Sequence, residues 1–144
     1  MQTDPVASLL PHVAPFCPTT RAMLVAMRRM AALGLFEAGA SMMMMQQFGL
    51  HFRKVLVLLR AYVMQASQGA DHAIRIAPCC APRMTQDEAA LLGTITLALQ
   101  DPARASAYAQ SLSQPHAAAS LLATAQVLAG AIADSGRRLV TVGE

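Results

Sequence analysis

Two adjacent cysteines, Cys79 and Cys80, lie between two prolines in a short loop and are the residues with the clearest potential for chemistry. Cys17 lies beside a proline near the N-terminus, and His12 and His72 precede Cys17 and Cys79 by five and seven positions. Thiolate sulfur and imidazole nitrogen are typical ligands of zinc and of some iron–sulfur clusters. The three cysteines with one histidine would therefore supply four ligands for zinc or an iron–sulfur cluster.

The spacing of the cysteines argues against a metal site. Structural zinc sites typically use C-x2–4-C pairs, which direct both sulfurs inward, whereas adjacent residues tend to point apart. A redox thiol needs a lowered pKa from a nearby cation or helix N-terminus, and only Arg83 is close in sequence. If oxidation occurs, a disulfide between Cys17 and one of the loop cysteines would be less strained than a disulfide between the adjacent Cys79 and Cys80. We favour small, partly buried free thiols, with metal binding or redox sensing as the alternative.

A helix start follows the cysteine loop directly. Thr85 and Glu88 have the spacing of a capping box. In this motif the hydroxyl and the carboxylate each accept a hydrogen bond from the other residue's backbone N–H. Helical patterns lie on both sides of the loop, so it joins the two halves of the protein.

The composition indicates one folded domain that buries a core. The chain has 144 residues, of which 55% are hydrophobic and 13% charged, and it contains no Trp. So few charges on a small protein suggest that a protein partner or a second copy covers some apolar surface. The N-terminus lacks the positive charge of a secretory signal, so we expect a cytoplasmic protein with reduced thiols. The apolar stretch 117–133 is Ala-rich and contains polar residues, which favours a core helix over membrane insertion.

The basic residues are unevenly distributed along the chain. Residues 1–60 hold six basic and two acidic residues, whereas residues 61–144 hold five basic and six acidic residues. The N-terminal set is Arg21, Arg28, Arg29, Arg53, Lys54 and Arg60. If the first and third helices are neighbours, these residues could form one basic patch that binds nucleic acid weakly. We favour a solvated face, since the helix between them has no Arg or Lys to meet phosphate or guanine.

The pattern predicts a mainly α fold: a single-domain bundle of about five to six helices with one or two short extended segments. Four prolines make residues 1–18 an extended arm that packs on the body, residues 19–144. The expected helices cover residues 20–33, 35–48, 52–68, 86–100, 102–112 and 115–134. Short strands are expected at 73–77 and 138–142, where they could pair.

The second predicted helix contains four consecutive methionines, Met42–Met45. Successive residues on a helix are about 100° apart, so this helix is apolar on every side and is expected to lie at the centre of the bundle. The same geometry prevents the four thioethers from binding one copper(I) ion together. Core filling is the favoured interpretation.

Recognisable catalytic motifs are missing from the sequence, which has no G-x-S-x-G, no glycine-rich phosphate loop and no H-E-x-x-H. We therefore assign no catalytic residues, and an enzyme is the less favoured class. The segments Arg28–Ala31, Phe52–Arg60 and Ala77–Glu88 resemble a family of short bacterial proteins without an assigned function, over roughly residues 10–100. The resemblance implies no activity. The leading hypothesis is a non-enzymatic protein-interaction or self-association module.

Overall fold

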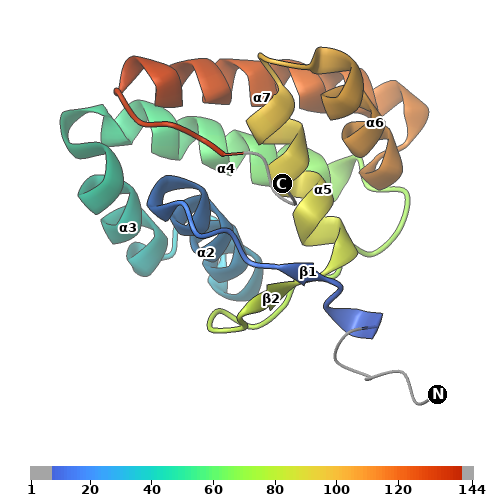
Figure 1. The fold of residues 1–144 in the computed structure, drawn as a ribbon, viewed down its shortest axis with the longest axis horizontal. Coiled ribbons are helices and arrows are strands. Elements are labelled where there is room, and N and C mark those ends of the chain that lie inside the picture. Colours follow the sequence, from blue (N-terminus) through green and yellow to red (C-terminus); the bar gives the residue numbers. More distant parts are fainter. Residues whose placement is uncertain (1–7, 141–144) are drawn as a thin grey trace.

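The computed structural model describes residues 8–140 and is mainly α-helical (Figure 1). Its helices are α2 (Pro18–Leu33), α3 (Ala38–Phe48), α4 (Phe52–Gln68), α5 (Gln86–Leu97), α6 (Pro102–Leu112) and α7 (Pro115–Asp134), with a 3-10 turn at Gly49–His51. Helices α4 and α7 lie side by side along the upper edge in Figure 1, and α2 and α3 pack together below them. The prediction of a mainly α, single-domain bundle is confirmed.

Local sequence signals set several helix ends. Gly34 and Gly49 follow α2 and α3 with φ angles of 107° and 54°. Residues other than glycine rarely adopt such positive φ angles. Asp101 caps α6 by accepting a hydrogen bond from the backbone N–H of Arg104. The predicted bounds of α4, α6 and α7 agree with the structure. Helix α5 ends at Leu97, earlier than the predicted end at residue 100, so Leu99 is exposed and does not face inward.

Helix α5 lies at the centre of the bundle. All residues from Glu88 to Leu97 are buried, and the helix packs against α6, α7 and α2. The expectation that the methionine-rich helix is central is therefore wrong. Of its methionines only Met44 is fully buried, while Met42 and Met45 are 59% and 50% exposed. Helix α3 covers one end of the core, where packing against α2 and α4 buries one side only.

A two-stranded antiparallel sheet ties the N-terminal arm to the cysteine loop. Strand β1 (His12–Val13) pairs with β2 (Arg83–Met84), and Ala14 N–H donates to the carbonyl of Pro82. Arg83 adds hydrogen bonds to the carbonyls of Leu10 and Pro11. Segments 73–77 and 138–140 form no strand, so the expected pairing between them is wrong over the described residues; 141–142 lie outside these.

Helix α7 is long and apolar enough to cross a membrane by length and composition, a criterion that core helices also meet. One side of α7 packs against α4, α5 and α6. The buried seam contains Leu121, Ala125, Leu128 and Ile132, which are the residues that the sequence period predicts.

Candidate functional site

The cysteine loop is held in place by a buried arginine. Arg28 of α2 is 2% exposed, and its Nε lies 2.6 Å from Oε2 of Glu88 on α5. Its two Nη atoms donate to the carbonyls of Ala81 at 2.8 Å and Arg83 at 2.9 Å. One side chain therefore joins α2, the loop and α5. The expectation of a solvated face is wrong for Arg28, which follows buried Leu24 by one helical turn and is itself buried.

Glu88 has two tasks in this network. Its Oε1 accepts the backbone N–H of Thr85 at 2.9 Å, and the Thr85 hydroxyl accepts the backbone N–H of Glu88 at 3.0 Å, which completes the capping box. The same hydroxyl donates to the carbonyl of Arg75 at 2.7 Å. The buried carboxylate is thus paired with Arg28 and hydrogen-bonded, as a buried charge requires.

Arg29 places a cation beside one thiol of the loop. Its Nε and Nη2 donate to both carboxylate oxygens of Glu37, at 3.0 and 2.8 Å, and its Nη1 lies 3.9 Å from Sγ of Cys79. The Arg29 guanidinium and the backbone N–H groups of Gly39 and Ala40 lower the pKa of Glu37 to about 2. Cys79 is half-buried and Cys80 is exposed, and both are free thiols.

Cys17 lies apart from the loop cysteines in its contacts. Its Sγ donates to the carbonyl of Arg138 at 3.4 Å, at the C-terminal end of the described chain. Partial burial raises the pKa of this thiol, but hydrogen bonds from Thr20 and Thr19 at the start of α2 outweigh burial, so the pKa lies below its ordinary value. Between residues 8 and 140, no three His, Cys, Asp or Glu side chains are placed to hold a metal ion. Zinc or cluster binding stays a prediction.

The two histidines of the proposed metal set, His12 and His72, contact polar side chains of the chain. Nε2 of His12 lies 2.7 Å from Oε1 of Gln86. His72 contacts Asp71 through Nδ1 and Asp87 through Nε2, the latter at 3.0 Å. Asp87 also accepts the backbone N–H of Arg75 at 2.8 Å. The His72 contacts therefore fix segment 71–75 against the first turn of α5.

This pairing makes stability depend on pH. The carboxylates of Asp87 and Asp71 raise the pKa of His72. A raised pKa gives stability that is complete below the unfolded value and is lost as the pH rises through the folded value. We expect the urea midpoint of the wild type to fall as the pH rises above the ordinary histidine pKa of about 6.5, and that of His72→Gln to change less. His116→Gln, at an exposed position of α7, should keep the wild-type profile; identical profiles for all three proteins would contradict the assignment.

The six basic residues of the N-terminal half have different environments. Arg28 is buried and Arg29 is paired with Glu37, whereas Arg21, Arg53 and Lys54 are exposed. The Arg60 Cζ lies 4.5 Å from the centroid of the Phe36 ring, and its Nε donates to the carbonyl of Leu35 at 2.9 Å. Nucleic-acid binding by one joint patch stays a prediction, with Arg21, Arg53, Lys54 and Arg60 at least partly available.

Arg60 also organises an apolar surface that the sequence did not single out. Val57 and Met64 lie about one turn before and one turn after Arg60 on α4. They are 60% and 44% exposed, and Phe36, under the Arg60 guanidinium, is 78% exposed. We call Phe36, Val57, Arg60 and Met64 the α4 outer face. The sequence signal for this surface was Val57, an apolar residue on the side of α4 that the helical period assigns to polar residues.

Most of the chain matches one protein family. The model of a family of unknown function, DUF6628, matches residues 10–133. The chain belongs to this family. The match covers β1 to the last turn of α7 and so includes the Arg28–Glu88 network, the cysteine loop and the α4 outer face of this DUF6628 member. Searches of the curated proteins and of the solved structures found no match.

Proposed function

We propose that this DUF6628 protein is a non-enzymatic interaction module whose α4 outer face binds an acidic, apolar segment of a partner protein. The observation that carries the proposal is the combination of exposed apolar side chains with positive charge on one helix face. Large exposed apolar groups rimmed by polar residues are typical of protein interaction sites.

The α4 outer face is held ready for binding. The guanidinium of Arg60 bonds to the carbonyl of Leu35 and, through Nη2, to Oγ of Ser41 at 3.2 Å, which fixes the turn that carries Phe36. A fixed aromatic side chain loses little conformational entropy on binding, which favours its use as an anchor.

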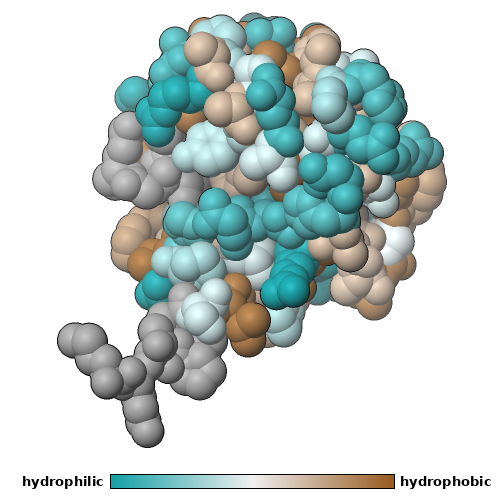
Figure 2. All heavy atoms as spheres, turned by 90° about the vertical axis from the view of Figure 1, so that its right-hand side faces the viewer, coloured by the Kyte–Doolittle hydropathy of each residue, from teal (hydrophilic) through white to brown (hydrophobic). Residues whose placement is uncertain are grey.

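The charge of this region favours an acidic partner. Residues 38–70 contain Arg53, Lys54 and Arg60 but no Asp or Glu. Glutamate or aspartate on a partner would complement these cations, whereas two copies of the same face would bring like charges together. The face of the molecule shown in Figure 2 differs from the α4 outer face, because hydrophilic residues form a broad band across its middle.

A designed amphipathic peptide tests the proposal. The probe is a fluorescent helix of about 18 residues with Leu and Phe on one face and Glu on the other. We expect saturable binding by fluorescence anisotropy, at least about tenfold tighter than binding of the same peptide with Lys in place of Glu.

Matched variants locate the binding surface. Val57→Glu should weaken peptide binding at least about tenfold because it places a like charge within an apolar contact. Val127→Glu, at a 55% exposed position of α7, is the control and should bind as the wild type does. Equal binding of the two variants, or a preference for the Lys peptide, would refute the proposal. A dimer in light scattering that Val57→Glu dissociates would assign the face to a second copy and refute the acidic partner.

A further inference from the structure

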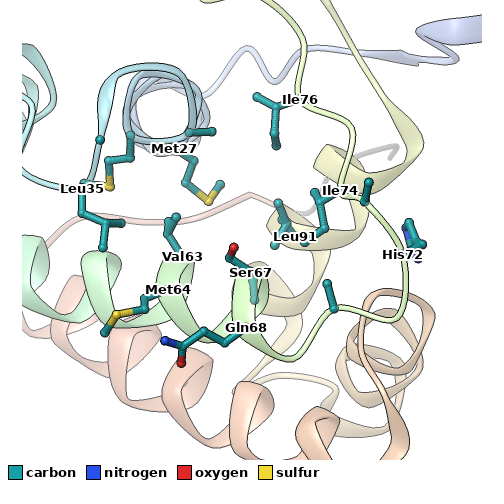
Figure 3. Close-up of a pocket in the computed structure, with 16 residues that line it drawn as sticks. Met27, Leu35, Val63, Met64, Ser67, Gln68, His72, Ile74, Ile76 and Leu91 are labelled. Atoms are coloured by element: carbon teal, nitrogen blue, oxygen red, sulfur yellow. The ribbon is translucent and has the colours of Figure 1, made fainter.

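A cavity of about 510 Å³ opens between α2, α4 and segment 70–76. Figure 3 shows Met27 of α2 and Val63 and Met64 of α4 on one side of it, with Ile74 and Ile76 opposite and Leu91 of α5 beside Ile74. The volume lies within the range of small-molecule sites, about 300–1,000 Å³. The cavity is distinct from the α4 outer face, with which it shares only Met64 among the described lining residues.

The lining explains why the space exists and what it can contact. The cavity is bordered by small residues, which leave space that larger side chains would fill: Ala31, Gly34, Ala66, Ala70 and Ala73. Met27, Met30 and Met64 also line it. Their flexible thioether side chains adapt to apolar ligands of varied shape. Such a lining favours a ligand with a flexible aliphatic chain.

The polar lining residues exclude a charged ligand. No Arg, Lys, Asp or Glu is among the described residues that line the cavity. His72 is at its edge, and both ring nitrogens are engaged by Asp71 and Asp87, so it has no nitrogen left for an anion. A charged ligand group in this site would lose hydrating water without gaining a free counter-charge, which would raise the free energy of binding by a large amount.

Two neutral hydrogen-bonding side chains at exposed positions, Ser67 and Gln68, line the cavity. The hydroxyl of Ser67 points between Val63 and Leu91 (Figure 3). Helical hydroxyls often bond to the carbonyl four residues earlier. Thr94 does so with Ala90 at 2.8 Å. Within residues 8–140 the Ser67 hydroxyl has no such partner. It can therefore both donate to and accept from a ligand hydroxyl.

We propose that this cavity binds a neutral molecule with a flexible aliphatic chain and a single hydroxyl, which bonds to Ser67. Medium-chain alcohols are the simplest members of this class. The ligand chain lies among the methionines and isoleucines, and its hydroxyl lies between α4 and α5.

Calorimetric titration with 1-decanol below its solubility limit tests the site. We expect saturable binding, with decanoate at least about tenfold weaker because its carboxylate finds no cation that is not already paired, since His72 is held by Asp71 and Asp87. Ser67→Ala should weaken 1-decanol binding by about three- to tenfold, the range for one lost hydrogen bond. No saturable binding of 1-decanol, or equal binding of decanoate, overturns the proposal.

Two alanine variants distinguish a cavity ligand from adsorption to the surface. Ala31→Phe, at an exposed position of α2 that borders the cavity, should reduce 1-decanol binding at least about tenfold. Ala123→Phe, at an exposed helical position of α7 outside the lining, should leave it unchanged. Equal effects of the two variants at wild-type circular dichroism overturn the proposal. Val57→Glu should not alter 1-decanol binding, so the outcome is independent of the acidic partner.

Discussion

Replacing Arg28 with methionine is expected to lower the free energy of unfolding by about 3–5 kcal/mol, the usual cost of removing one partner of a buried ion pair. The variant leaves the carboxylate of Glu88, which is 1% exposed, without its counter-charge. It also removes the donors to the carbonyls of Ala81 and Arg83. Urea unfolding followed by circular dichroism measures the effect.

The matched control is Arg21→Met on the same helix. Arg21 is exposed. Its replacement should therefore change the free energy of unfolding by less than about 0.5 kcal/mol. A second test is Glu88→Gln, which keeps the shape of the side chain but leaves the Arg28 charge unpaired. If Arg28→Met and Arg21→Met had similar effects, the buried network would contribute nothing specific to stability.

Replacing Met44 with alanine is expected to cost about 2–5 kcal/mol, because removal of a fully buried side chain leaves a cavity. Met44 is 0% exposed, whereas Met42 and Met45 on the same helix are 59% and 50% exposed and provide controls of the same residue type. Replacing either control with alanine should change the free energy of unfolding by less than about 0.5 kcal/mol. Urea unfolding compares the three variants. Comparable losses at the three positions would indicate that the methionine-rich helix is enclosed on all sides.

The local features of the fold could be predicted from the sequence. Proline at the first helical position predicted the starts of α6 and α7, Gly69 predicted the end of α4, and Thr85 with Glu88 predicted the start of α5. These signals depend on neighbouring residues, so a single sequence contains them. The seam of α7 followed from the helical period for the same reason.

The long-range features could not be predicted in this way. The partner of Arg28 lies 60 residues away, and β1 and β2 come from opposite halves of the described chain. A run of apolar residues does not show which of them is covered, so the methionines of α3 were all assigned to the core. The α4 outer face could not be predicted as a whole, because the turn before α3 brings Phe36 next to Arg60, which is distant in sequence.

The closure of α2 onto α5 by Arg28 has a consequence for protein synthesis. Glu88 is made 60 residues after Arg28, and the β1–β2 sheet also waits for the second half of the chain. At ordinary elongation rates of about 5–20 residues per second, α2 remains without its buried partner for about 3–12 s, plus the time for residue 88 to leave the ribosome. During this interval Met23, Met27 and Met30 lack part of their cover. The nascent N-terminal half therefore exposes apolar surface until the second half of the chain is made, and such exposure promotes aggregation.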